Sequence, residues 1–340
     1  MIVVDGSQGE GGGQVLRSSL ALSLVTGLPF RIEKIRAGRP KPGLMRQHLT
    51  AVNAAVEIGR AQVEGAHIGS QALVFAPRSI KAGSYHFAVG TAGSCTLVLQ
   101  SVLPALLTAD SPSELLLEGG THNPHAPPFD FLELAFLPLI RKMGPNVSAT
   151  LQRPGFFPAG GGKITVSVEP VARLQRLDLP ERGTILDRSA RAVVARLPRS
   201  IAERELKVVR DRLNWEERSF SVEEAVSSMG PGNVLCLEIV SEHITEVFTG
   251  FGELGVSAEK VAGDTVKAVE EYLAANVPVG RYLADQLLLP MALAGGGSFR
   301  TLTPTRHMST NADVIRQFLP VEVSMRQYAR NDWEIRVASS

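Results

Sequence analysis

The chain has 340 residues, of which 44% are hydrophobic, and its 35 Lys and Arg residues nearly balance its 34 Asp and Glu residues. This length and apolar content can bury a large core, and the balanced charge excludes a protein whose whole surface is basic. Two cysteines, Cys95 and Cys236, stand far apart, which excludes a disulfide scaffold and a cysteine-built zinc site. No signal-peptide pattern and no apolar run near the ~20 residues of a membrane span are present, so we expect a cytoplasmic protein.

The first loop, DGSQGEGGGQVLR from Asp5 to Arg17, is dense in glycine and precedes an apolar helix that begins near Gln14. Glycine lets the backbone approach a ligand closely, and a helix N-terminus offers unpaired N–H groups to an anion. The loop therefore indicates phosphate binding. It matches neither common phosphate-loop pattern, because no Lys-Ser or Lys-Thr follows the glycines and Gln14 replaces the last glycine of the dinucleotide fingerprint. A tight turn before a core helix is the alternative interpretation.

The predicted elements recur three times as helix, strand, helix, strand, strand. In the first copy the helices span 14–27 and 44–60, and the strands span 30–37, 61–67 and 71–76. In the second copy the helices span 94–109 and 129–143, and the strands span 113–118, 147–153 and 163–169. In the third copy the helices span 284–293 and 311–319, and the strands span 298–303, 321–327 and 333–337. This repetition predicts a pseudo-threefold assembly of α/β units in which the loops 38–43, 121–128 and 304–310 converge.

A segment of different character, residues 183–277, separates the second and third copies. It contains a predicted strand, AVVARLP, an amphipathic helix that opens with Ser200 and Glu203 at capping-box spacing, a further strand and a long polar helix. Proline punctuates both of its ends. We therefore expect a large domain over residues 1–182 and 278–340, interrupted by a smaller inserted α/β domain over 183–277.

Basic side chains crowd the loop before the second helix of the first copy. They are Arg31, Lys34, Arg36, Arg39, Lys41, Arg46 and His48. In a charge-balanced chain this concentration indicates an anion-binding surface, because arginine forks fit phosphate oxygens. A solvated loop of alternating charge is the alternative.

Among the histidines, His307 has the position of a candidate catalytic group. It lies between Arg306 and a Ser-Thr-Asn cluster, in the loop predicted before the last helix. A neutral imidazole is a competent nucleophile or base at pH 7, and an adjacent arginine can hold a phosphate. A helix-capping histidine is the alternative. His122 and His125 share a loop but have no third ligand nearby, which disfavours a metal site there.

Two further segments carry groups suited to a nucleotide. The run YLADQ, Tyr282 to Gln286, combines an aromatic ring, a carboxylate and an amide at a predicted helix start. Such groups suit stacking on a base and hydrogen bonding to it. Gln100 is polar within the apolar stretch TLVLQSVLPALL, so either a ligand or another buried group should satisfy its amide.

Several long motifs, in their order along the chain, resemble the RNA 3′-terminal phosphate cyclase family. They are GSQGEGGGQVLRSSLALS, IRAGRPKPGLMRQHLTAV, GSCTLVLQ, GFFPAGGG, GPGN, YLADQLLLPMALAG and HMSTN, and the resemblance covers essentially the whole chain. It implies a large domain of three repeated α/β units, as in enolpyruvyl transferases, with a smaller inserted domain. It also implies an ATP-dependent enzyme whose nucleophile is His307. That histidine takes AMP from ATP with release of pyrophosphate and passes it to an RNA 3′-phosphate. The neighbouring 2′-hydroxyl then closes a 2′,3′-cyclic phosphate and releases AMP.

The same resemblance assigns the other site residues. It places Mg²⁺ or Mn²⁺ on Glu10, and the adenosine pocket on Gln100, Pro128, Phe248, Tyr282, Leu283, Ala284, Asp285 and Gln286. It places RNA phosphates on Arg17, Arg36, Arg39 and Gln47. The implied partners are ATP and RNA with a 3′-phosphate end, without a membrane. Two rivals remain: a non-catalytic relative in ribosomal RNA processing, a branch that lacks the histidine, and an enolpyruvyl transferase, which would need a phosphoenolpyruvate site.

Overall fold

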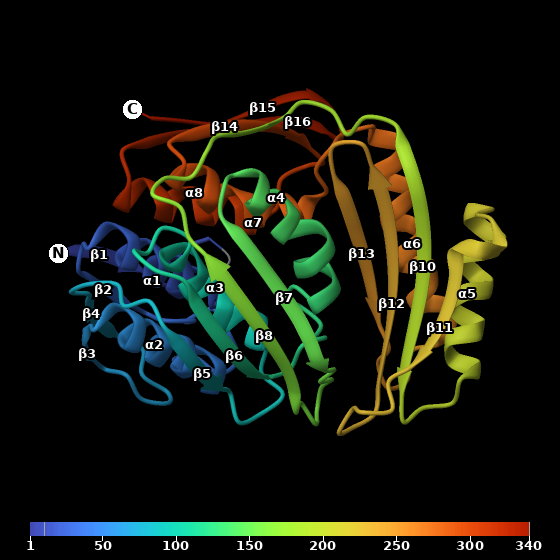
Figure 1. Cartoon of the computed structure of the whole chain (residues 1–340), viewed down its shortest axis with the longest axis horizontal. Coiled ribbons are helices and arrows are strands. Elements are labelled where there is room, and N and C mark those ends of the chain that lie inside the picture. The colour runs from blue at the N-terminus through green and yellow to red at the C-terminus, as the bar shows by residue number, and fades with distance from the viewer. Residues whose placement is uncertain (10, 340) are drawn as a thin grey trace.

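A computed structural model describes residues 1–9 and 11–339 of the chain. Three four-stranded sheets lie around a set of central helices, and a fourth four-stranded sheet with its own helices stands beside them (Figure 1). The mixed α/β class expected from the sequence is confirmed.

Each of the three repeats contains the same elements in the same order. The first consists of β1 (Ile2–Asp5), α1 (Gln14–Thr26), β2 (Phe30–Glu33), α2 (Arg46–Gly59), β3 (Gln62–Glu64) and β4 (Leu73–Ala76). The second consists of β5 (Ser84–Ala88), α3 (Cys95–Leu106), β6 (Ser113–Gly119), the π-helix η1 (Phe131–Phe136) continuing into α4 (Leu137–Lys142), β7 (Asn146–Arg153) and β8 (Gly162–Glu169). The third consists of β9 (Leu177–Leu179), α7 (Arg281–Leu293), β14 (Gly296–Thr301), α8 (Arg306–Phe318), β15 (Val321–Ala329) and β16 (Asp332–Ser339).

Strand pairing shows that the repeats share one topology. Their sheets have the orders β1-β2-β4-β3, β5-β6-β8-β7 and β9-β14-β16-β15. In each sheet the first pair is parallel and the other two pairs are antiparallel. The predicted repeat is confirmed, but each unit begins with a further strand that the predicted repeat did not include. These leading strands are only three to five residues long, so each gives only a short alternating signal.

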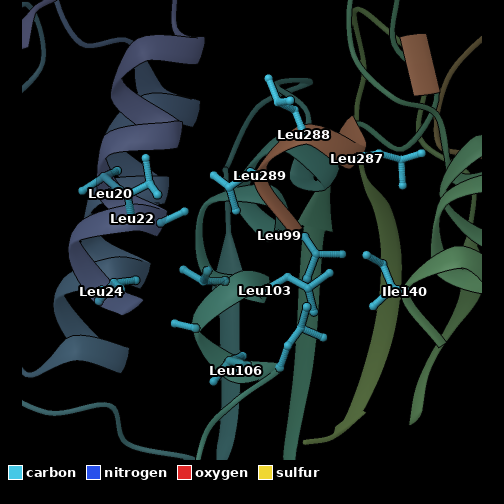
Figure 2. Packing of buried hydrophobic residues seen from close by; sticks show 14 of the residues in the cluster. Leu20, Leu22, Leu24, Leu99, Leu103, Leu106, Ile140, Leu287, Leu288 and Leu289 are labelled. Atoms are coloured by element: carbon cyan, nitrogen blue, oxygen red, sulfur yellow. The ribbon is translucent and has the colours of Figure 1, made fainter. Parts of the chain in front are cut away.

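Sequence composition explains why the helices lie inside and the sheets outside. The first helix of each repeat, α1, α3 or α7, is rich in leucine and has most of its residues buried. The strands instead alternate buried and exposed residues, as β5 does, because one face of each sheet meets water. Figure 2 shows leucines of the three first helices meeting in one core, among them Leu22, Leu106 and Leu288, all fully buried.

The inserted unit follows β9 and returns to α7. Its elements are β10 (Ile185–Ala195), α5 (Ser200–Leu213), the short 3₁₀-helix η2 (Glu217–Ser219), β11 (Phe220–Glu224), β12 (Gly232–Ser241), β13 (Thr245–Phe251) and α6 (Ala258–Ala275). Its sheet has the order β11-β10-β12-β13, which differs from the repeats. Leu235 and Leu237 of β12 pack beneath α5 and α6, whereas Cys236 between them joins the core of the repeats. All seven elements fall within residues 183–277, and the domain boundaries themselves stay a prediction.

Several local predictions were wrong. The helix expected at 311–319 begins at Arg306, because Thr305 caps it: Thr305 Oγ1 accepts a hydrogen bond from Met308 N at 3.2 Å. The capping box on Ser200 and Glu203 does not form. Ser200 is already helical, and Glu203 pairs instead with Arg199 at 3.0 Å.

The third wrong prediction is the single helix at 129–143, which is a π-helix followed by an α-helix. In addition, the helix expected from residue 284 begins three residues earlier, at Arg281. Over the described residues, no helix combines the length and the apolarity needed to cross a bilayer.

We predict that the core of first helices carries a large share of the stability. Leu106→Ala, which removes a fully buried side chain of α3, should lower the free energy of unfolding by about 2–5 kcal/mol, since a cavity is left behind. Leu254→Ala is the matched control, because Leu254 is fully exposed and its truncation should change stability by less than about 0.5 kcal/mol. Urea unfolding followed by circular dichroism measures both, and equal effects would contradict the central position of α3.

Candidate functional site

The glycine-rich loop before α1 packs directly against the starts of two other helices. Gly9 has a φ of +60°, and a β-carbon there would overlap the side chain of Thr310 on α8. A β-carbon at Gly13 would overlap the imidazole of His48 on α2. Glycine is therefore required at both positions because of close backbone approach. The loop brings together the N-terminal ends of α1, α2 and α8, an arrangement that favours an anion.

His307 lies in the first turn of α8 and is tied to the start of α1. Its Nδ1 is 2.6 Å from Gln14 Oε1, and Gln14 Nε2 is 3.5 Å from the backbone oxygen of His307. The second contact orients the Gln14 amide with its oxygen toward the ring, so Nδ1 carries the proton and donates it to Gln14. The lone pair of the neutral imidazole is consequently on Nε2.

The surroundings of His307 favour its neutral form. Burial lowers the pKa of His307 below its ordinary value of 6.5, and the positive charges of Arg17 and Arg39 lower it further. The imidazole is therefore uncharged at neutral pH. A neutral ring with a proton fixed on Nδ1 is suited to act as a nucleophile or base through Nε2.

A chain of hydrogen bonds joins the first helices of the three repeats. Arg17 Nε on α1 donates to Gln100 Oε1 on α3 at 2.9 Å, and Gln100 Nε2 donates to Gln286 Oε1 on α7. The partner expected for the Gln100 amide is thus found in the protein itself. Burial lowers the pKa of Arg17 to about 10, so its guanidinium remains positively charged at pH 7.

This chain forms the polar end of a pocket between α1, α3, the π-helix and α7. The polar lining consists of Gln14, Arg17, Ser18, Thr96, Gln100, Asp285, Gln286 and Asn311. The remaining lining is apolar and comes mainly from α3 and the π-helix, including Leu103, Phe131 and Leu132. An apolar cleft with a few convergent polar groups is the usual form of a small-molecule site.

Asp285 connects the pocket to the helix of His307. Both of its carboxylate oxygens lie 2.8 Å from Thr305 Oγ1, the cap of α8. Burial raises the pKa of Asp285 to about 7, although the Thr305 hydrogen bond and the charge of Arg281 act in the opposite direction. Asn311 of α8 extends the connection, because Ser18 Oγ on α1 donates to its Oδ1 at 2.7 Å. These bonds fix α8 against α1 and α7.

Two members of the basic cluster predicted around residues 31–48 are paired with carboxylates. Arg31 pairs with Glu33 at 2.7 Å, and Lys34 pairs with Asp5 at 2.9 Å. The next arginine along the chain, Arg36, makes its contacts within its own loop.

Arg36 holds its own loop together. Its Nη1 donates to the backbone oxygens of Lys41 at 2.7 Å and Gly43 at 2.9 Å. His48 is buried and neutral, because burial lowers its pKa to about 3 with the help of the charges of Arg17 and Arg36. Positive charge that acts on His307 comes from Arg17 and Arg39.

The remaining predicted site residues lie at varied places. Gln47 Oε1 accepts from Ser94 N at 3.1 Å and so joins α2 to the start of α3. Phe248 of β13 packs its ring against Tyr272 at 5.4 Å, and Pro128 is buried just before the π-helix. Tyr282 is exposed.

Leu283 and Ala284 are fully buried, so only their backbone could meet a ligand. Gln100, Asp285 and Gln286 line the pocket together with Arg17, whereas Pro128, Phe248 and Tyr282 are outside its lining. Glu10 lies outside the described residues. Among those that are described, no group of three or more His, Cys, Asp and Glu side chains could hold a metal ion.

Sequence reasoning missed Gln14, Thr305 and Asn311 as site residues. Thr305 had a signal, since a threonine three residues before an apolar helical pattern is a typical cap. Gln14 and Asn311 lie in the glycine-loop motif and the Ser-Thr-Asn cluster, but their partners on α8 and α1 are almost three hundred residues away in the sequence, so their contacts could not be predicted.

The fold and the site define a class of protein: a three-repeat α/β protein with a neutral histidine at convergent helix starts, beside a pocket that combines an apolar wall with several polar side chains. A sequence profile of RNA 3′-terminal phosphate cyclase matches residues 8–325. An RNA 3′-terminal phosphate cyclase of Koribacter versatilis (strain Ellin345) is 55% identical over 327 residues, which cover 96% of this chain and 92% of the relative. One of Ralstonia nicotianae (strain ATCC BAA-1114 / GMI1000) is 55% identical over 326 residues, covering 96% and 93%. The chain therefore belongs to the RNA 3′-terminal phosphate cyclase family.

We predict that His307 titrates below 6.5 and that Arg39→Ala raises its pKa, because a positive charge that opposes protonation is removed. At pH 6.5 less than half of His307 should be protonated in the wild type. Titration by NMR of ¹³C-labelled histidine measures both values, and His307→Gln identifies the signal. An unchanged pKa in Arg39→Ala would contradict the electrostatic contribution of Arg39.

Proposed function

We propose that the protein converts RNA 3′-phosphate ends into 2′,3′-cyclic phosphates at the expense of ATP, with His307 as the nucleophile. The observation that carries the proposal is the contact between His307 Nδ1 and Gln14 Oε1, which leaves the reactive lone pair on Nε2. Membership of the RNA 3′-terminal phosphate cyclase family supports the overall cyclisation. The cytoplasmic location expected from the sequence stays a prediction.

In the first step, His307 Nε2 attacks the α-phosphorus of ATP. A phosphorus–nitrogen bond forms, the bond from the α-phosphorus to the bridging oxygen breaks, and pyrophosphate leaves with the electron pair. The ring becomes positively charged as it attacks, and the Gln14 carbonyl oxygen stabilises that charge through the Nδ1 proton. Helix starts around the glycine loop are placed to receive the negative phosphates.

In the second step, an oxygen of the RNA 3′-phosphate attacks the same phosphorus atom. The phosphorus–nitrogen bond breaks, neutral His307 is regenerated, and AMP is joined to the RNA end through a phosphoanhydride. In the third step, the neighbouring 2′-hydroxyl attacks the RNA phosphorus, loses its proton to a base or to solvent, and expels AMP. His307 thus divides one difficult activation into two displacements.

The pocket beside His307 is the proposed adenosine site. Gln100, Asp285 and Gln286 provide hydrogen-bonding groups next to an apolar wall, which suits a nucleoside. Arg17 and Arg39 supply positive charge near His307 for the phosphate of the RNA end. Glu10 is the proposed ligand of Mg²⁺ or Mn²⁺, which would neutralise phosphate charge and favour departure of pyrophosphate.

Covalent labelling tests the nucleophile. The wild type incubated with α-³²P-labelled ATP and Mg²⁺ should acquire a label that survives denaturation, is labile to acid and is stable to alkali. His307→Ala should lose it completely, because no other group can form the bond. His67→Ala, a matched change at an exposed histidine, should keep it. A wild type that never acquires label would instead favour the non-catalytic relatives that act in RNA processing.

Separate measurement of the two half-reactions tests the RNA role of Arg39. At pH 8, His307 is neutral both in the wild type and in Arg39→Ala. Arg39→Ala should therefore leave self-adenylylation within about twofold of wild type. Transfer of AMP to an RNA 3′-phosphate should fall about tenfold or more, since a charge-assisted phosphate contact is lost. The loss should shrink at high salt, which weakens the wild-type contact. Equal effects on both half-reactions would remove Arg39 from the RNA site.

A further inference from the structure

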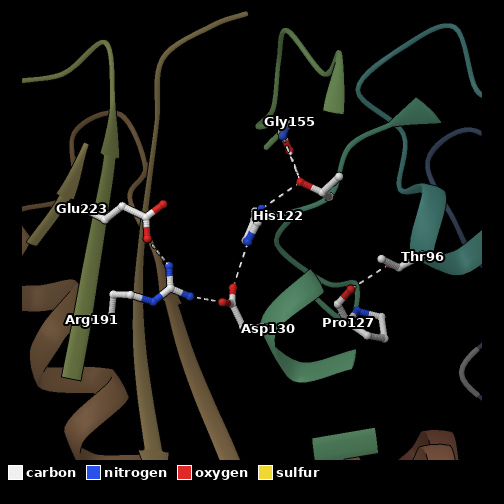
Figure 3. Close-up of polar contacts among 8 residues, drawn as sticks. Thr96, His122, Pro127, Asp130, Gly155, Arg191 and Glu223 are labelled. Carbon is white, nitrogen blue, oxygen red and sulfur yellow. Dashed lines mark hydrogen bonds and ion pairs between the residues drawn. The ribbon is translucent and has the colours of Figure 1, made fainter. Parts of the chain in front are cut away.

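A partly buried ionic chain connects the inserted unit to the second repeat. Arg191 on β10 pairs with Asp130, the residue that precedes the π-helix, and with Glu223 on β11 at 2.6 Å (Figure 3). On its other side, Asp130 Oδ2 accepts from His122 Nε2 at 2.9 Å. The chain therefore spans two units that are separate in the fold.

The alternation of side chains along β10 explains why Arg191 faces the repeats. On β10, Ala190 and Ala192 point toward α5 and α6, so Arg191 between them points to the opposite face, toward the repeats. Its neighbours on that face, Val193 and Cys236, are buried. An arginine on an apolar face needs a carboxylate partner, and Asp130 supplies it.

Asp130 is itself held in one position and in its charged form. Burial opposes its charge, but the His122 hydrogen bond and the charges of His122 and Arg191 outweigh burial and lower its pKa. His122 is fixed in turn by its stacking on Phe156 at 5.3 Å and by Thr121 Oγ1, which lies 2.8 Å from His122 Nδ1. Thr121, His122 and Asp130 have the order of a catalytic triad, but Thr121 is only 1% exposed, so a substrate cannot reach it.

The chain acts on the proposed adenosine site through the π-helix. Asp130 is the residue from which that helix starts, and Phe131, Leu132 and Phe136 of the helix line the pocket. The strand β13, which carries Phe248, packs against the same π-helix. π-helical turns are rare and occur mostly at functional sites, where the surrounding structure must hold them. From the inserted unit, Arg191 pairs with the residue that precedes this wall.

We propose that Arg191 is a positioning residue for nucleotide binding: its pairing with Asp130 sets the inserted unit against the π-helix and so shapes the apolar wall of the pocket, without contact to the nucleotide. This inference rests on the proposed function, because the ligand of the pocket is taken to be ATP. It extends that function by assigning the inserted unit a part in ATP affinity.

Kinetics of self-adenylylation under single-turnover conditions provide the test. Arg191→Met, which keeps the length of the side chain but not its charge, should raise the ATP concentration for half-maximal rate about tenfold. The rate at saturating ATP should stay within about twofold, since His307 and Gln14 are not moved. Arg191→Lys should restore part of the affinity. Arg204→Met is the matched control, because Arg204 forms a bidentate ion pair with Glu259 inside the inserted unit. This substitution should change neither the ATP concentration for half-maximal rate nor the rate at saturating ATP.

A double-mutant comparison and a measurement without turnover complete the test. Asp130→Asn combined with Arg191→Met should weaken ATP affinity little more than either change alone, because both remove the same contact. Amide hydrogen exchange of residues 131–136 should accelerate in Arg191→Met and not in Arg204→Met. An unchanged ATP dependence in Arg191→Met, or a fall in saturating rate that follows loss of folded protein, would overturn the inference. If the wild type forms no adenylate, the proposed function fails, and unchanged exchange at 131–136 would then overturn the positioning role independently.

Discussion

The structure depends on the burial of three leucine-rich helices, α1, α3 and α7, at one centre. A polar side chain at such a place has little access to water and must find its partner within the protein. Arg17, Gln100 and Gln286, one from each helix, satisfy one another in a single chain of hydrogen bonds. Because each bond needs a defined direction, the chain specifies how the helices are rotated about the centre, which leucine packing alone does not. The candidate site lies beside these three polar side chains.

The position of His307 follows from that arrangement. α8 is fixed to α7 through Thr305 and Asp285 and to α1 through Asn311 and Ser18. These bonds hold the His307 ring where Gln14 can fix its proton on Nδ1. Burial and nearby arginines keep the ring neutral, and the same arginines favour negatively charged ligands. One electrostatic environment thus serves both the nucleophile and the phosphates that we propose it meets.

The inserted unit is joined to the repeats by both apolar and ionic contacts. Cys236, Ile244 and Val247 of the inserted unit belong to the core of the repeats. Apolar contact gives attraction without direction, whereas the Arg191–Asp130 pair requires one relative placement. A buried ion pair contributes little net stability compared with apolar packing, so its value here is the geometry that it imposes on the π-helix.

The sequence alone predicted the repeats, the α/β class and the candidacy of His307, because periodicity, composition and motifs are local properties. The glycine loop was recognised in the same way, and the structure adds that its glycines are needed for contact with α2 and α8. Tertiary structure alone decided the partners. The leading strands join their repeats only through parallel pairing in space, and Gln14 meets His307 across 293 positions of sequence. His122, which looked incidental, acquires its role from Asp130 and Arg191, since a hydrogen bond or ion pair depends on distance in space and not on distance along the chain.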